Sequence, residues 1–142
     1  DLSEAEWDEH LEVNLTAPFL LAAAAGRLMQ RQGHGKIVNL ADIGGVKIWA
    51  DYLPYSVSKA GLIALTRGLA KALAPAVQVN AIAPGVVLLP EAATAEERTR
   101  AVRRIPLGRL GTPGEVAHTL LYLVENDFVT GQVIALDGGQ SL

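Results

Sequence analysis

"ADIGGVKIWADYLPYSVSK", residues Ala41–Lys59, joins the end of a short apolar strand to the start of a helix. Tyr55 and Lys59 are four residues apart, so both side chains lie on one face of that helix. Asp42 precedes Tyr55 by 13 residues and lies just after the end of the strand. We therefore expect a phenol, an amine and a carboxylate to gather where the strand ends.

The elements on either side of this stretch alternate between helix and strand. We expect helices at 3–32 (broken locally by Pro18), 53–74, about 95–104 and 113–125, and strands at 36–40, 77–83 and within 131–139. The strands are apolar on both faces, which is typical of a parallel sheet covered by helices on both sides. The predicted fold is therefore α/β, a doubly wound parallel sheet.

In a doubly wound sheet, ligands bind beyond the carboxyl ends of the strands. Asp42 follows one predicted strand, and the segment 84–89 follows the next. Tyr55 and Lys59 lie on the helix between these two strands. The sequence therefore predicts one crevice that all of these residues border.

Composition excludes several classes of protein. The chain has 142 residues, of which 50% are hydrophobic and 19% charged, which favours one folded domain. A net charge of −3 gives no indication of nucleic-acid binding. The absence of cysteine excludes disulfides and fits a reducing compartment, so we expect a cytoplasmic protein. His10, His34 and His118 lack metal-ligand spacing, and no segment is apolar enough to cross a membrane, so we expect neither metal nor membrane.

The chemistry of the tyrosine depends on its neighbours. An ordinary phenol has a pKa of about 10, too high for acid–base work at neutral pH, and a nearby ammonium would lower it. Tyr55 and Lys59 are therefore predicted to be a catalytic pair, and the alternative is a chance surface pair. Asp42 either caps the loop "DIGG" or contacts a substrate. Because an anion raises the pKa of a phenol, a functional Asp42 would serve the substrate, most simply one rich in nitrogens.

Three asparagines lie in apolar surroundings and need partners. Asn14, within "VNLTAPFLL", holds either a water or backbone group near the site or a plain buried hydrogen bond. Asn39 and Asn80 lie inside strands, and we expect them to tie strands and loops together.

The 53–74 helix has only three charged residues, so its apolar surface is wider than one stripe. We expect the extra face, together with the alanines 22–25 of the first helix, to pack on another subunit.

Five segments in this order resemble the short-chain dehydrogenase/reductase family over essentially the whole chain: "IVNL", Tyr55-x-x-x-Lys59, "VNAIAPG", "PLGRLGTPGEVA" and "TGQVIALDGG". The resemblance implies a Rossmann-like fold, a nicotinamide cofactor and hydride transfer. It also implies that Tyr55 donates the proton, that Lys59 lowers the pKa of Tyr55 and binds the nicotinamide ribose, and that Asn14 holds a relay water. The cofactor-binding residues that it implies are Leu40, Ala41, Tyr55, Lys59, Pro84, Gly85, Val86 and Val87.

Two departures from the family pattern point to one branch. Asp42 stands where the family usually has Ser, and Leu89 stands where it often has Thr. Both features are similar to those of the pteridine reductases. This resemblance implies NADPH-dependent reduction of a C=N bond in a pterin, with Asp42 and Tyr55 at the substrate. The apolar walls of the pterin site would be Trp49, Val86 and Leu89.

Two other functions remain open from the sequence. One is a carbonyl or 3-oxoacyl reductase of the same family in which Asp replaces Ser. The other is a non-catalytic binding or scaffold protein that keeps the fold.

The family's Gly-rich phosphate loop and the residues that select NAD or NADP lie upstream in that family, and residues 1–142 contain neither. We therefore expect 1–142 to be the carboxyl-terminal half of a single Rossmann-like domain, with about three βα units of the amino-terminal half missing. The resemblance also favours a homotetramer formed through helices 3–32 and 53–74.

Overall fold

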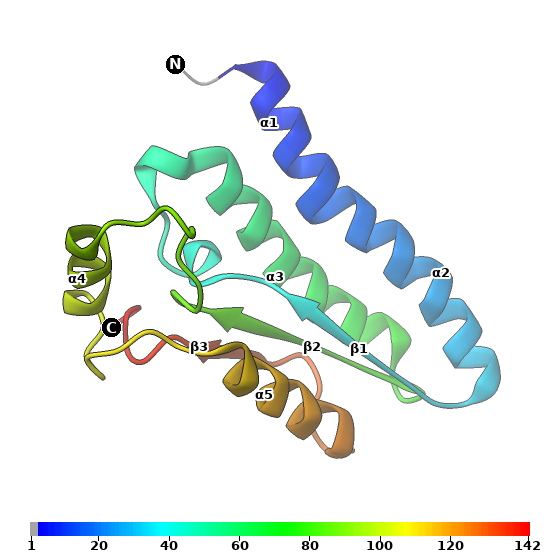
Figure 1. The fold of residues 1–142 in the computed structure, drawn as a ribbon. Coiled ribbons are helices and arrows are strands. Elements are labelled where there is room, and N and C mark those ends of the chain that lie inside the picture. Colours follow the sequence, from blue (N-terminus) through cyan, green and yellow to red (C-terminus); the bar gives the residue numbers. More distant parts are fainter. Residues whose placement is uncertain (1–2) are drawn as a thin grey trace.

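The computed structural model describes residues 3–142 and contains a parallel sheet. Its strands are β1 (Gly35–Leu40), β2 (Val77–Pro84) and β3 (Val133–Leu136), in the spatial order β1-β2-β3 (Figure 1). Gly35 lies opposite Val77, and Ala81 lies opposite Val133. The predicted parallel sheet and its three strands are confirmed.

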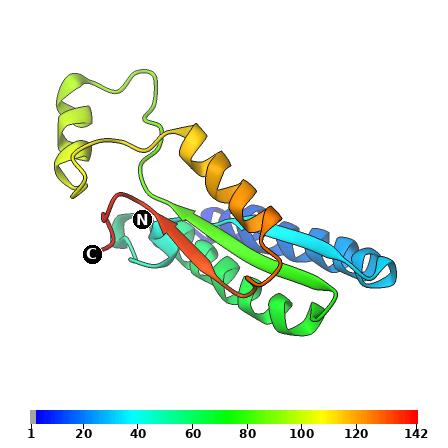
Figure 2. The ribbon, with the colours of Figure 1, turned by 90° about the horizontal axis from the view of Figure 1, so that it is seen from below.

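Helices cover both faces of this sheet. Helices α2 (Ala17–Gln32) and α3 (Leu53–Leu73) lie on one face, and α5 (Pro113–Glu125) lies on the other (Figures 1 and 2). Two short 3₁₀ turns, η2 (Ile43–Gly45) and η3 (Ala50–Tyr52), connect β1 to α3. Helix α4 (Ala95–Arg103) lies beyond the ends of the strands. The doubly wound α/β prediction is confirmed.

The first predicted helix is continuous but changes its pitch. α1 (Glu4–Leu11) runs through a π-helical turn, η1 (Glu12–Thr16), into α2. Pro18, in the first turn of α2, has no N–H to donate to the carbonyl of Asn14. The helix therefore widens at Asn14 instead of breaking, a geometry that is frequent at functional sites.

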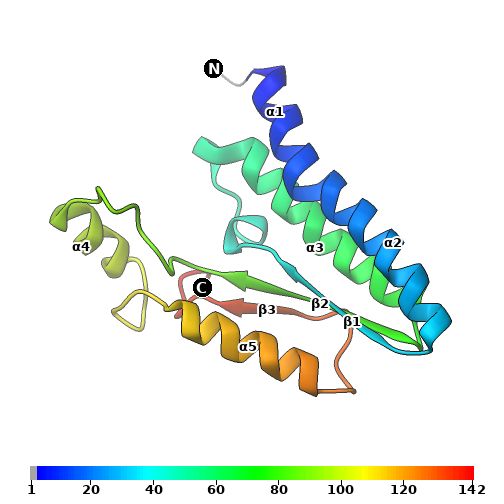
Figure 3. The same ribbon diagram turned by 45° about the vertical axis from the view of Figure 1, so that its right-hand side comes forward.

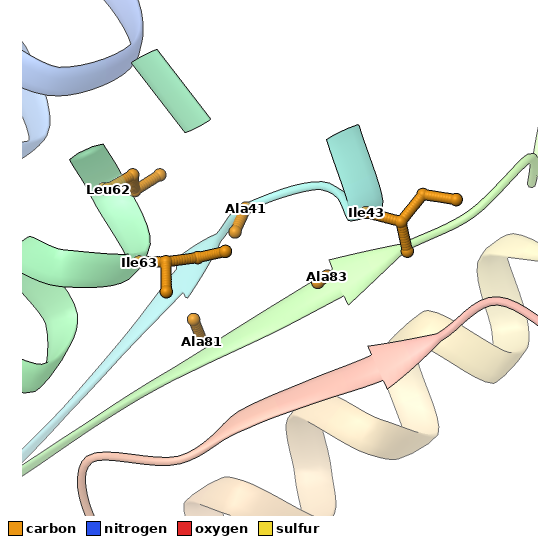
Figure 4. Packing of buried hydrophobic residues seen from close by; sticks show 6 residues of the cluster. All are labelled: Ala41, Ile43, Leu62, Ile63, Ala81 and Ala83. Atoms are coloured by element: carbon orange, nitrogen blue, oxygen red, sulfur yellow. The ribbon is translucent and has the colours of Figure 1, made fainter. Parts of the chain in front are cut away.

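The core lies between α3 and the sheet. One cluster of buried residues surrounds the carboxyl ends of the strands and includes Ala41, Ile43, Leu62, Ile63, Ala81 and Ala83 (Figure 4). A second cluster near the other end contains Ala70, Leu73, Val77 and Val79. The first cluster packs the turn η2 directly against α3, and this fixes the position of Asp42, which caps η2.

Two strand asparagines act as the sequence predicted. Nδ2 of Asn39 donates to Oγ1 of Thr66 at 2.9 Å and joins β1 to α3. Asn80 donates to the carbonyl oxygen of Val129 and accepts from the backbone N–H of Gln132, which ties β2 to the loop before β3.

Among residues 3–142, no helix combines the length and hydropathy that a membrane crossing requires. Within the same residues, no group of three or more histidine or acidic side chains has an arrangement that could hold a metal ion.

Candidate active site

The first two turns of α3 present Tyr55 and Lys59 at the carboxyl end of β1. Nζ of Lys59 donates to the carbonyl oxygen of Leu40 at 3.1 Å. The same nitrogen lies 5.7 Å from the centroid of the Tyr55 ring. The phenol and the amine predicted from their spacing therefore share one face of α3, and that face meets the end of the strand.

Asp42 has two roles in the geometry. Its Oδ1 accepts a hydrogen bond from the backbone N–H of Gly44 at 2.6 Å and caps η2, as the loop-capping alternative predicted. Its carboxylate also lies close enough to Tyr55 to act on the phenol by charge and by hydrogen bonding. The carboxylate is therefore held by the turn and lies near enough to Tyr55 to raise the pKa of its phenol.

Gly45 explains why this turn lies so close to α3. A Cβ atom at this position would come within 2.6 Å of the backbone carbon of Lys59 and 2.8 Å of the backbone nitrogen of Ala60. Only glycine permits that approach without displacing one of the two backbones. The Gly44–Gly45 pair therefore places Asp42 beside the face of α3 that carries Tyr55 and Lys59.

The electrostatics of the site bear on the prediction that Lys59 lowers the pKa of Tyr55. Burial raises the pKa of Tyr55 above its ordinary value, and the charge of Asp42 and hydrogen bonding to it raise this pKa further. Burial lowers the pKa of Lys59, against the opposing effect of Asp42. The amine contacts the Leu40 carbonyl, and the causes of the raised pKa are burial and Asp42, so the lowering of this pKa by Lys59 stays a prediction.

Two fully buried serines fix the backbone around Tyr55. Oγ of Ser58 donates to the carbonyl oxygen of Tyr55 at 2.7 Å and accepts from Nδ2 of Asn14 at 3.2 Å. Oγ of Ser56 accepts from the backbone N–H of Trp49 at 3.2 Å. The amide of Asn14 therefore reaches the site through Ser58, which is the plain hydrogen bond that the sequence left open for it.

Aromatic side chains surround the phenol. The ring of Trp49 stacks on that of Tyr55, with centroids 6.5 Å apart and planes at 12°. The ring of His10 meets Tyr55 edge-on, with centroids 5.9 Å apart, and Tyr52 meets Trp49 edge-on at 6.4 Å. A hollow of about 450 Å³ opens beside this group, lined by Glu6, His10, Ala50, Asp51, Tyr52, Pro54 and Tyr55.

The predicted walls after β2 lie elsewhere. Val86 lines a small hollow of about 80 Å³ together with Leu107, Leu136 and Asp137. Leu89 lines another hollow, at the start of α4. Of the three predicted walls, Trp49 contacts the ring of Tyr55, whereas the placement of Val86 and Leu89 against a substrate stays a prediction.

The predicted cofactor-binding residues differ in what they expose. Leu40 is 57% exposed, whereas Ala41 is 3% exposed and its backbone N–H donates to the carbonyl oxygen of Ile82. Gly85 packs against the carboxyl-terminal turn, because a Cβ there would lie 2.9 Å from the Cβ of Asp137. Pro84, Val86 and Val87 are half-buried in the same segment.

Sequence reasoning missed His10 as part of this site, and it missed the hydrogen bonds that Ser56 and Ser58 make there. His10 had been weighed only as a metal ligand, but it precedes Asn14 by four residues and so shares its helix face. The two serines lie in the first turns of an otherwise apolar helix, where a hydroxyl needs a nearby acceptor. Helical spacing from Asn14 and the position of the serines were the signals available.

Known proteins resemble the chain over nearly its whole length. A family model described as enoyl-(acyl carrier protein) reductase matches residues 1–141. The chain is 42% identical to the (2S)-[(R)-hydroxy(phenyl)methyl]succinyl-CoA dehydrogenase subunit BbsD of Thauera aromatica, over 99% of this chain and 58% of that protein. It is 41% identical to the 3-oxoacyl-[acyl-carrier-protein] reductase FabG of Aquifex aeolicus, over 97% of this chain and 58% of that protein.

Solved structures show the same fold. The chain is similar to the alternative dihydrofolate reductase 1, FolM, of Brucella suis in complex with NADP, at a TM-score of 0.91 and 40% identity. This match covers 99% of the present chain and 57% of FolM. The chain therefore spans little more than half the length of the proteins that it matches.

Proposed function

The chain belongs to the short-chain dehydrogenase/reductase family, and we propose that its protein reduces a C=N bond of a pterin with NADPH. The observation that carries this proposal is the Asp42 carboxylate, which is held by the N–H of Gly44 and lies near enough to Tyr55 to raise the pKa of its phenol. The similarity to FolM, whose name describes a dihydrofolate reductase, supports the same substrate class.

A carboxylate at this position suits a ring with nitrogen donors. An ionised carboxylate can only accept hydrogen bonds, and so can the carbonyl oxygen of a ketone substrate. The two groups therefore cannot bond to each other. The amino group and ring N–H of a pterin donate, so Asp42 and the pterin are complementary. The stacked pair of Trp49 and Tyr55 adds a flat aromatic surface beside the carboxylate, which favours a planar ring.

The residues at this edge fit the nicotinamide end of a dinucleotide. Lys59 places an amine donor at the carboxyl end of β1, and Leu40 exposes an apolar side chain there. The half-buried segment 84–87 follows the neighbouring strand β2 at the same edge of the sheet. Lys59 would hold a ribose hydroxyl, and the backbone of 84–87 would border the nicotinamide.

When bound, the nicotinamide supplies a hydride to the carbon of the C=N bond. Tyr55 is protonated at neutral pH, because burial and Asp42 raise its pKa, which makes it a weaker acid than a free phenol. It would donate its proton as the electron pair of the C=N bond moves onto the ring nitrogen and makes that nitrogen a much stronger base than the phenolate. The Asp42 carboxylate holds the donor groups of the pterin, and Trp49 limits water access to the phenol. Ser58 and Asn14 fix the backbone that carries Tyr55.

A second candidate is a 3-oxoacyl or carbonyl reductase. The 41% identity to FabG favours it, and the Tyr55–Lys59 pair would serve a ketone equally well. Asp42 argues against it, because a carboxylate beside the phenol would repel the oxyanion that develops on a ketone oxygen.

The test follows NADPH oxidation by the full-length protein with dihydrobiopterin, dihydrofolate, a 3-oxoacyl thioester and a panel of ketones. We expect turnover of the two pterins and little turnover of the others. Turnover of the thioester or ketones alone would replace the proposal with the second candidate. NADPH binding without any turnover would indicate the non-catalytic alternative.

We also propose that copies of the protein pack through α2 and α3 to form a homotetramer. Five large apolar side chains on η1 and α2 are exposed: Val13, Phe19, Leu20, Leu21 and Leu28. Light scattering on the full-length protein should show a tetramer, and Leu21→Lys should reduce the assembled species. An unchanged mass for Leu21→Lys, or a monomeric wild type, would contradict this assembly. A cytoplasmic location also belongs to the proposal.

A further inference from the structure

Helix α4 and the residues that follow it carry a concentrated positive charge. Between Glu97 and Glu115 the chain has five arginines and no acidic residue, although its net charge is −3. These arginines are Arg98, Arg100, Arg103, Arg104 and Arg109. The charge of this segment is therefore opposite in sign to that of the whole chain.

Three of these arginines form one face. Arg100, Arg103 and Arg104 are related by spacings of three and four residues, so their side chains lie next to one another, whereas Arg98 points to another side. We call Arg100, Arg103 and Arg104 the arginine face. All three are exposed, and no helix or strand covers them among the residues that the structure describes.

The arginine face has no carboxylate partner within residues 3–142. The ion pairs in this part of the chain are Lys36–Asp127 and Arg109–Glu115, so Arg109 is occupied. Glu97 is held in a capping box with Thr94. Glu96 lies beside Arg100 and Arg103, and Glu97 also interacts with Arg100 by charge, so both offset part of the positive charge.

The position of α4 connects this charge to the active site. The chain leaves the carboxyl end of β2, passes through the segment 84–94 and enters α4. Figures 1 and 3 show α4 beyond the same edge of the sheet at which the amino-terminal end of α3, with Tyr55, lies. A ligand that is bound at this edge and extends outward from it would therefore approach α4.

The size of the hollow on α4 suits a small anionic group. Ala95, Glu96, Thr99, Arg100 and Arg103 line an open hollow of about 390 Å³, which lies within the range of small-molecule sites. Guanidinium groups bind carboxylates through two parallel hydrogen bonds. A chain of carboxylates attached to the substrate matches this geometry more closely than the broad surface of a protein does.

We infer that the arginine face of α4 binds the anionic tail of the substrate, such as the glutamate carboxylates of a folate, while the pterin ring lies at Tyr55. This inference rests on the proposed function. It assigns ring and tail to different elements, so removal of the arginines changes substrate affinity and leaves the proton transfer intact.

The experiment compares three dihydropterins: tail-free dihydrobiopterin, dihydrofolate and tetraglutamyl dihydrofolate. In the double variant Arg100→Gln/Arg103→Gln, we expect the KM for the tetraglutamyl substrate to rise about tenfold, with kcat unchanged. The KM for dihydrobiopterin should stay the same. Arg98→Gln, on another side of α4, is the matched control and should leave all three KM values unchanged. High salt should shrink the difference between the wild type and the double variant.

Other results would overturn the inference. An equal rise in KM for all three substrates would mean that the arginines support α4 rather than bind a tail, because basic residues in a last turn also stabilise a helix. Unchanged KM values for all three substrates would mean that the arginines only face solvent and bind no part of the substrate. A rise seen only with a substrate attached to an acidic carrier protein would make that protein the occupant.

A failure of the proposed function is distinguishable from a failure of this inference. If no pterin is reduced, calorimetric binding of tetraglutamyl dihydrofolate to the full-length protein decides the matter. Weaker binding in the double variant than in Arg98→Gln would support the tail site, and equal binding would overturn it.

Discussion

The amino-terminal end of α3 and helix α4 lie at the same edge of the sheet but are built in opposite ways (Figure 3). Around Tyr55, the serines at 56 and 58 are fully buried and hydrogen-bonded, and η2 packs tightly on the helix. Helix α4 has no buried residue and is held mainly by its caps. A buried support suits a group that must stay in place during chemistry, whereas an exposed helix suits recognition of a charged group.

This comparison predicts a division of kinetic effects. Changes around Tyr55 should reduce kcat, and changes on α4 should raise KM for tailed substrates only. The predictions below test the α3 side of that division, from the largest expected effect to the smallest.

Removal of the phenolic hydroxyl should have the largest effect. Tyr55→Phe keeps the stacking with Trp49 but removes the proton donor, so kcat for dihydrobiopterin should fall by about 10²–10⁴-fold. Steady-state NADPH oxidation by the full-length protein measures this fall. Tyr52→Phe, whose ring is 64% exposed, is the control and should change kcat little. A Tyr55→Phe variant that retained most of its activity would remove the distinction between the two regions.

An added methyl group at Gly45 should disturb the packing of η2 against α3 and leave α4 unaffected. In Gly45→Ala, the Cβ collides with the backbone of Lys59 and Ala60, so the free energy of unfolding should fall by about 1–3 kcal/mol. Urea denaturation followed by circular dichroism measures the change. Gly68→Ala is the matched control, because a Cβ at that exposed position meets nothing within 4 Å. Equal stability of the two variants would show that η2 does not need its close contact with α3.

The smallest effect concerns ionisation of the phenol. Because Asp42 contributes to the raised pKa of Tyr55, Asp42→Asn should lower that pKa. Ionisation of Tyr55 should therefore begin at a lower pH in the variant, and phenolate absorbance, read as the difference from Tyr55→Phe, measures it. In the wild type, a raised folded-state pKa keeps the full stability contribution below about pH 10, and stability falls as the pH rises above that value. An unchanged titration in Asp42→Asn would mean that burial alone sets the pKa.

Much of the fold could be predicted because its signals are local. The capping boxes at Ser3, Thr94 and Thr112 mark helix starts, and the apolar runs mark the strands, so the predicted bounds differ from the structure by only a few residues. The spacing of Tyr55 and Lys59 likewise determines that they share a helix face.

The rest depends on contacts between distant segments. Sequence could not show that Lys59 bonds the Leu40 carbonyl, or that burial is the first cause of the raised pKa of Tyr55. The orientation of Val86 toward Leu107 and Asp137 depends on how the carboxyl-terminal turn packs against Gly85. The charge of α4 was visible in the sequence, but its position at the catalytic edge was not.

The most direct test of the account is Asp42→Ser, assayed with dihydrobiopterin and with a 3-oxoacyl thioester in the full-length protein. If the carboxylate binds the pterin, kcat/KM for dihydrobiopterin should fall by more than about tenfold, which corresponds to the loss of at least about 1.4 kcal/mol of binding to the transition state. Activity toward the thioester should stay the same or increase. Undiminished pterin turnover in Asp42→Ser would show that Asp42 only caps its turn, and would contradict the assignment of a pterin to this site.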